Sequence, residues 1–234
     1  SSGYGFDLDY VLGGRKARWA VRRASGEQRL YYRVVVYDDP TIEEADTTPA
    51  FPDPPDLEEP VLPAANDLMA SVRAQSADAD TLVSTLLQRV NAPSPDANVA
   101  LLFPESMSSL RRAAMLTDLL AIVRVPARPL RGLLLAEEQR NTPVRTYLEI
   151  HNGVEWHYYN VNTGEAGLPG NFYTWWRGDD ALSDVQGGSN VQLNFAVRRS
   201  QLDSLNIAAQ RAERRGSIVV DFSLFSLPIQ TRYC

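Results

Sequence analysis

Three residues of this chain, Ser109, Arg145 and Asn160, stand in motifs where chemistry could be expected. A serine hydroxyl attacks a carbonyl only when a general base accepts its proton. Arg145 stays protonated at neutral pH and cannot be that base. Asn160 carries no charge, so it cannot stabilise an imidazolium as a carboxylate does. Groups of these types are suited to binding a ligand through hydrogen bonds and one positive charge.

The two histidines, His151 and His157, are the other candidates for a base. His151 follows Arg145 by six residues, which is about 20 Å along an extended strand. His157 differs in parity from Asn160, so in a regular strand the two face opposite sides. The single cysteine, Cys234, is the last residue and cannot form an internal disulfide. With no metal-ligand spacing and no phosphate-binding glycine motif, we expect neither a metal nor a cofactor.

The elements that position these residues follow from apolar spacing. Helical patterns begin at Asn66, after Asp78 or Asp80, and after Ser106 or Ser108, and the third predicts a helix that is buried nearly all round. Strands are predicted over residues 128–135, 144–151 and 154–161, with an Asn-Gly turn at 152–153. Further strands are predicted over 191–197 and 217–224, and a helix over 201–214. Helices followed by antiparallel strands are typical of an α+β fold.

The N-terminal third is different in composition. Residues 15–37 predict a β-hairpin, since two β-rich runs flank a Ser-Gly-Glu turn. Residues 38–63 hold seven of the fifteen prolines and nine acidic residues, with no lysine or arginine, which predicts an extended linker. We therefore expect an N-terminal hairpin or strand extension over 1–37, an acidic linker over 38–63 and a main domain over 64–234.

Composition excludes several classes of protein. The net charge is −6 over 234 residues, which argues against a nucleic-acid partner. No run approaches the roughly 20 apolar residues of a transmembrane helix. Because the chain begins Ser-Ser-Gly and shows no signal-peptide pattern, we expect an excised or processed soluble piece.

Three segments resemble the core of the transglutaminase-like superfamily: LLAIVRVPARPLRGLLL (119–135), RTYLEIHNGVEW (145–156) and YYNVNTG (158–164). The resemblance implies a transglutaminase-like, cysteine-protease-like core in which helices pack on an antiparallel sheet. It aligns Ser109 with the catalytic cysteine, Arg145 with the histidine and Asn160 with the aspartate of active members. All three catalytic positions are then substituted, which implies a pseudoenzyme.

The second half of the chain resembles one particular family within this superfamily. Residues 145–178, 185–197 and 222–231 are similar to the inactive transglutaminase-like domain fused to seven transmembrane helices in bacterial proteins, and the likeness spans about Leu68 to Thr231. It implies a domain on the periplasmic face of the inner membrane, with a membrane anchor before the hairpin and a membrane region starting soon after Ile229. It also implies association with ATP-grasp ligase-like and retropepsin-like proteins.

The leading hypothesis is a non-catalytic, extracytoplasmic sensing or binding module that signals to the membrane region of the same polypeptide. In it, Ser109, Arg145 and Asn160 would hold the carboxylate of a peptide or amino acid, helped by the N–H groups of the Ser109 helix. The alternative is a vestigial site in which the three side chains hydrogen-bond to one another or to a nearby acid. A serine-dependent hydrolase or acyltransferase using Ser109, and a structural scaffold for a membrane complex, stay open as other functions.

Overall fold

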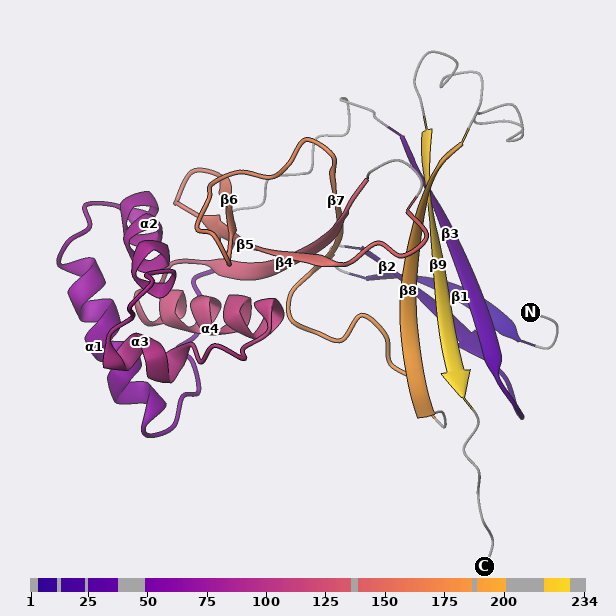
Figure 1. Cartoon of the computed structure of the whole chain (residues 1–234), viewed down its shortest axis with the longest axis horizontal. Helices are drawn as coiled ribbons and strands as arrows, with labels where there is room; N and C mark the ends of the chain where they lie inside the picture. The colour runs from indigo at the N-terminus through magenta and orange to yellow at the C-terminus, as the bar shows by residue number, and fades with distance from the viewer. Residues whose placement is uncertain are drawn as a thin grey trace, which may run out of the picture. The chain divides into compact units, whose positions relative to one another are not determined.

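The computed structural model describes residues 4–11, 14–23, 25–37, 49–135, 139–186, 189–200 and 217–227. These residues form helices and antiparallel sheets, so the predicted α+β class is confirmed (Figure 1). Two compact units are present: unit 1 comprises residues 1–42, 133–143 and 181–234, and unit 2 comprises 43–132 and 144–180. Unit 1 thus takes strands from both ends of the chain, whereas the sequence predicted consecutive domains. Within the described ranges, no helix combines the length and the apolar character needed to cross a bilayer.

Unit 1 is built from β-strands in two sheets. Its strands are β1 (Gly5–Val11), β2 (Gly14–Ala20), β3 (Gln28–Tyr37), β8 (Ser189–Ser200) and β9 (Ser217–Leu227). β1 pairs antiparallel with β2, and the second sheet has the order β3-β9-β8. Phe6, Trp19 and Tyr32 form a ring cluster with centroids 5.4–6.3 Å apart, which joins the hairpin to β3.

The N-terminal hairpin predicted over residues 15–37 is wrong in its pairing. β2 pairs with β1, in the register Phe6↔Trp19, so the hairpin spans residues 5–20. β3 pairs instead with β9, almost two hundred residues later, in the register Val34↔Val220. Local turn residues suggested a hairpin, but the sequence carries no local sign of so distant a partner strand.

Unit 2 places its helices before its strands. The helices are α1 (Val61–Arg73), α2 (Ala79–Val90), α3 (Ala97–Leu102) and α4 (Ser109–Ile122). Asp78 caps α2 in a capping box with Thr81, and Ser108 caps α4. These caps confirm one of the two starts predicted for each helix. α1 begins at Val61, inside the predicted linker, and α3 was not predicted.

The sheet of unit 2 has the order β6-β5-β4-β7. Its strands are β4 (Ala127–Leu134), β5 (Arg145–His151), β6 (Trp156–Asn160) and β7 (Phe172–Arg177). β5 pairs antiparallel with both β4 and β6, as the predicted hairpin requires. β7 was not predicted. It approaches β4 at Gly132, where a Cβ would collide with the Tyr173 carbonyl and the Phe172 ring.

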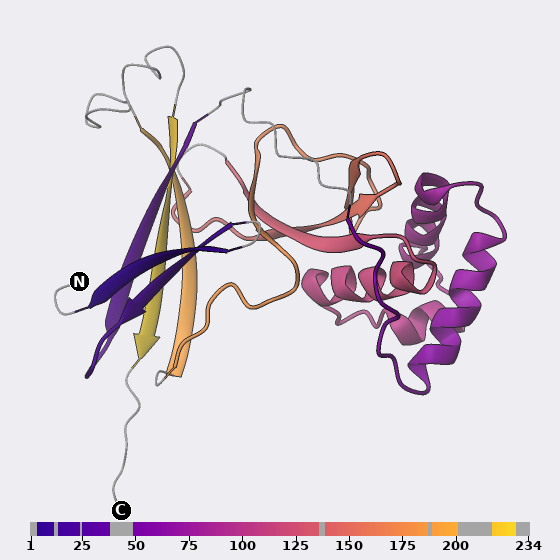
Figure 2. The same cartoon turned by 180° about the vertical axis from the view of Figure 1, so that it is seen from behind.

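Helix α4 packs along one face of this sheet (Figures 1 and 2). Leu116, Leu119 and Leu120 of α4 are completely buried, as are Leu148 and Ile150 on the facing side of β5. Five of the fourteen residues of α4 are buried, eight are half-buried and Arg111 is exposed, so the helix is covered on most sides but less completely than predicted. This packing fixes the direction of the site strands, because Leu148 and Ile150 point to the helices while the alternate residues of β5 point away.

Some predicted features lie outside the described residues. These are the helix over 201–214, residues 38–48 of the linker, the segment after Ile229 and Cys234. Residues 49–60 are described and contain no helix or strand, as expected for a linker.

Candidate functional site

The start of α4 carries the first candidate residue. Ser108 accepts a hydrogen bond from the Arg111 backbone N–H at 3.3 Å, so the helix begins at Ser109. The Ser109 hydroxyl lies 3.2 Å from Oδ1 and 3.1 Å from Nδ2 of Asn162. Its hydrogen-bond partner is therefore a neutral amide, which cannot accept the hydroxyl proton as a base would.

Asn160 ends β6 opposite Tyr147 of β5. Its Oδ1 accepts hydrogen bonds from the backbone N–H groups of Asn162 at 3.0 Å and Thr163 at 3.4 Å. These bonds turn the chain sharply after β6 and bring Asn162 to the start of α4. Ser109 and Asn160 are thus linked through Asn162, a residue that the sequence analysis did not single out.

Arg145 begins β5 opposite Gly132 and is exposed. It lies two residues before Tyr147 on the same face of the strand, which is about 7 Å along the strand. Among the described residues, no hydrogen bond or ion pair joins Arg145 to Ser109 or to Asn160. The three predicted site residues therefore comprise one linked pair and one separate cation.

The histidines do not supply a base to Ser109. His157 pairs with Ile150 in the sheet and so faces the helices, as its parity predicted. Its Nδ1 lies 2.7 Å from Asp80 of α2, and its Nε2 lies 3.2 Å from Glu155. The hydrogen bond to Glu155 and the hydrogen bond and charge of Asp80 raise the pKa of His157, against a smaller opposing effect of burial.

His151 is 4% exposed and stacks edge-on against Trp156, with ring centroids 5.2 Å apart. Its Nδ1 accepts a hydrogen bond from the Gly153 backbone N–H at 3.2 Å. This interaction holds the β5–β6 turn, so His151 has a structural role.

Arg112 of α4 positions the turn that carries Asn162. Its guanidinium donates to the carbonyls of Val90 and Val161 and to Oδ1 of Asn91, each at 2.9 Å. Burial lowers the pKa of Arg112, but an arginine stays protonated in proteins. One half-buried cation thus joins the end of α2, the start of α4 and the exit of β6. This role was not predicted, because the groups that Arg112 binds belong to segments 21 to 49 residues away along the chain.

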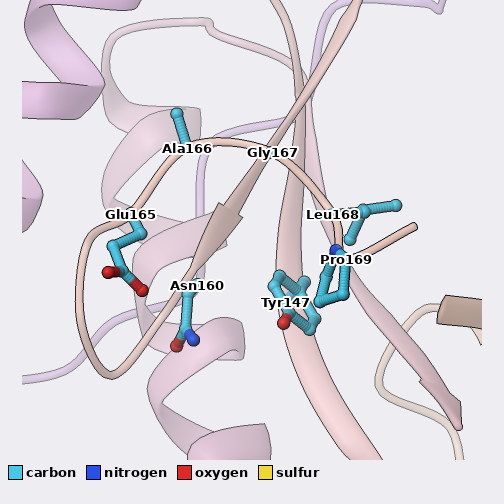
Figure 3. Close-up of a pocket in the computed structure, with 7 residues that line it drawn as sticks. All are labelled: Tyr147, Asn160, Glu165, Ala166, Gly167, Leu168 and Pro169. Carbon is cyan, nitrogen blue, oxygen red and sulfur yellow. The ribbon is translucent and has the colours of Figure 1, made fainter. Parts of the chain in front are cut away.

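An open pocket of about 480 Å³ lies beside Asn160 (Figure 3). Its lining comes from β5, the end of β6 and the following loop: Tyr147, Asn160, Glu165, Ala166, Gly167, Leu168 and Pro169. Figure 3 shows the Asn160 amide between the Glu165 carboxylate and the Tyr147 ring. Ser109 and Arg145 do not line this pocket. The loop lies within residues 145–178, which carry the family resemblance, and no pocket was predicted there.

The one carboxylate of β5, Glu149, has its hydrogen-bond partners within the fold. Glu149 is 1% exposed, and its oxygens accept hydrogen bonds from Nε of Arg128 at 2.6 Å and from Nε of Arg177 at 3.2–3.3 Å. The Arg128 guanidinium also lies over the Trp156 ring, 4.3 Å from its centroid. A buried carboxylate needs such partners because desolvation is costly. Glu149 therefore serves the fold.

Taken together, these contacts allow binding but supply no catalytic base within the described residues. The Ser109 hydroxyl has an amide partner, and both histidines are held elsewhere. Asn160, where active relatives of the superfamily are expected to hold an acid, shapes a turn and borders an open pocket.

Residues 1–106 match the model of a protein family described as an inactive transglutaminase fused to seven transmembrane helices. This match covers just under half of the chain and supports the family suspected from the sequence. It covers the N-terminal strands and helices α1–α3, and overlaps the expected span of likeness from about Leu68 over residues 68–106. Ser109, Arg145 and Asn160 lie after the matched segment. No curated protein and no solved structure matches the chain.

Proposed function

Because residues 1–106 match this inactive transglutaminase family, we propose that the chain is a non-catalytic, extracytoplasmic ligand- or partner-binding domain of a membrane protein. The domain would be built on a degenerate transglutaminase-like core. The observation that carries the proposal is the pairing of the Ser109 hydroxyl with the Asn162 amide, close to an open pocket that begins at Asn160.

The case against catalysis rests on proton transfer. Loss of general-base catalysis alone costs about 10²–10⁴-fold in rate. His157 is engaged by Asp80 and Glu155, and His151 is buried against Trp156. A hydrolase or acyltransferase using Ser109 would therefore need a base from outside the described residues.

Binding is supported by the size and the polarity of the pocket. A volume of about 480 Å³ lies within the range of about 300–1,000 Å³ typical of small-ligand sites. Arg145, at the nearby start of β5, offers a planar cation suited to a carboxylate. Our proposal therefore keeps a peptide or an amino acid as the ligand, with Arg145 as the group that binds its carboxylate.

The proposal also includes the surroundings of the domain. The family description couples the inactive transglutaminase to seven transmembrane helices. We propose that the domain lies on the periplasmic face of the bacterial inner membrane and passes ligand or partner occupancy to that membrane region. Association with ATP-grasp ligase-like and retropepsin-like proteins is part of the same proposal.

A ligand screen by NMR chemical-shift perturbation tests the binding function. Ala166 is exposed and lines the pocket, so Ala166→Trp should fill it and abolish binding. Ala100 is exposed on α3, outside the pocket lining, and Ala100→Trp is the matched control that should bind normally. Binding that persists in Ala166→Trp would contradict the proposed site. Unchanged affinity for acidic peptides in Arg145→Ala would remove Arg145 from it.

A further inference from the structure

The pocket beside Asn160 is negative in charge. Of its seven lining residues, Glu165 is the one acidic residue, and no lysine, arginine or histidine lines it. Glu165 is exposed, so its carboxylate is accessible to a ligand. A carboxylate without a cationic neighbour favours a positively charged ligand group over a negative one.

Two oxygen atoms in the pocket have spare hydrogen-bonding capacity. Oε2 of Glu165 accepts a hydrogen bond from the Thr163 hydroxyl at 2.9 Å, and Oε1 has no partner in the part of the chain that the structure describes. The Tyr147 side chain is 7% exposed, yet its hydroxyl has no hydrogen-bond partner among those same residues. The hydroxyl oxygen is not among the fully enclosed atoms without a partner, so a donor group of a ligand can reach it and hydrogen-bond to it.

The remaining lining fits an apolar stem. Ala166, Leu168 and Pro169 are apolar residues of the lining. An ammonium group has three donors and no acceptor, and so matches a carboxylate and a phenol oxygen. Arg145, a short way along β5, lies on the same strand face as Tyr147, where it could meet a carboxylate at the other end of the same ligand.

We infer that the ligand carries a protonated amino group on an apolar stem, and that Glu165 and Tyr147 bind this group. The inference rests on the proposed binding function and names the chemistry of its ligand. A short apolar peptide with a free N-terminus is a ligand of this class.

Three related dipeptides distinguish the contribution of the ligand ammonium from that of the ligand carboxylate. Their affinities are measured by calorimetric titration at low ionic strength. Leucyl-leucinamide carries only the ammonium, N-acetyl-leucyl-leucine only the carboxylate, and leucyl-leucine both. We expect leucyl-leucinamide to bind at least fivefold more tightly than N-acetyl-leucyl-leucine. Glu165→Gln should weaken leucyl-leucinamide binding by about fivefold to tenfold and leave N-acetyl-leucyl-leucine unchanged, because an exposed ion pair contributes modestly. Asp67→Asn, which removes an exposed acid of α1, is the matched control and should change neither affinity.

Tyr147→Phe adds a second, independent variant. It removes the hydroxyl while keeping the ring that packs against Phe172 at 5.0 Å, so the fold should persist. Weaker leucyl-leucinamide binding in this variant supports the inference. Equal or tighter binding of N-acetyl-leucyl-leucine, or unchanged leucyl-leucinamide affinity in Glu165→Gln, overturns it. Absence of binding by all three dipeptides also overturns the inference about the ligand. The proposed binding function is tested separately by the wider ligand screen: it fails if no ligand binds the wild type and is excluded by Ala166→Trp.

Discussion

Glu149 and Glu165 are two carboxylates of unit 2 with opposite surroundings. Glu149 is 1% exposed and accepts hydrogen bonds from Arg128 and Arg177. Glu165 lines an open pocket, with the Thr163 hydroxyl as the partner of one oxygen. A buried charge is retained only where its partners are built in, while an exposed charge can remain available to a ligand. The first carboxylate therefore belongs to the fold, and the second is available for binding.

The largest effect should come from Glu149→Gln. The substitution keeps the shape of the side chain but removes the charge that Arg128 and Arg177 neutralise, so the free energy of unfolding should fall by about 3 kcal/mol. Urea denaturation followed by circular dichroism measures this change. A fall in the free energy of unfolding of less than about 1 kcal/mol would mean that hydration of the two arginines compensates for the loss of their ion pairs with Glu149.

Arg112→Met should have the next largest effect. It leaves the Val90 and Val161 carbonyls and the Asn91 amide oxygen without their donor, and should lower the free energy of unfolding by about 2 kcal/mol. It should also loosen the turn that holds Asn162 beside Ser109. Hydrogen exchange of the Asn162 and Thr163 amides reports that loosening. The neighbouring exposed Arg111→Met is the matched control and should change stability by less than about 0.5 kcal/mol.

His157→Gln should have a smaller effect that depends on pH. The pKa of His157 is raised in the folded state, so its ion pairs contribute fully below the ordinary imidazole pKa of about 6.5 and are lost as pH rises through the folded value. Between about pH 6 and pH 8 the wild type should lose up to about 1 kcal/mol of stability relative to His157→Gln. Thermal denaturation at several pH values measures the difference. A stability difference between the two proteins that does not change with pH would contradict the contribution assigned to the His157 ion pairs.

The smallest effect on stability should come from Glu165→Gln. It is the same chemical change as Glu149→Gln but at an exposed position, and should alter the free energy of unfolding by less than about 0.5 kcal/mol. The pair of variants thus tests the comparison directly by urea denaturation. A loss at Glu165 close to that at Glu149 would show that the pocket carboxylate also supports the fold.

Local signals in the sequence predicted much of unit 2. Asp78 and Ser108 were among the predicted caps, and the Asn-Gly pair placed the β5–β6 turn. Parity placed His157 and Asn160 on opposite faces of β6, as the register shows. Each of these depends on neighbours a few residues away, which a sequence displays directly.

The features that were missed depend on distant partners. β3 pairs with β9, and Arg112 bonds to carbonyls of Val90 and Val161, residues that no local pattern connects. The pocket likewise forms where the loop after β6 passes Tyr147 of β5. Ser109 and Asn160 were identified by resemblance, but their link through Asn162 required the folded chain.

The central claim is that Ser109 no longer acts as a nucleophile. Intact-mass analysis after incubation with a fluorophosphonate probe, comparing the wild type with Ser109→Ala, tests it most directly. We expect that neither the wild type nor Ser109→Ala gains the mass of a covalent adduct. A single adduct on the wild type that is absent from Ser109→Ala would show an activated serine and contradict the claim.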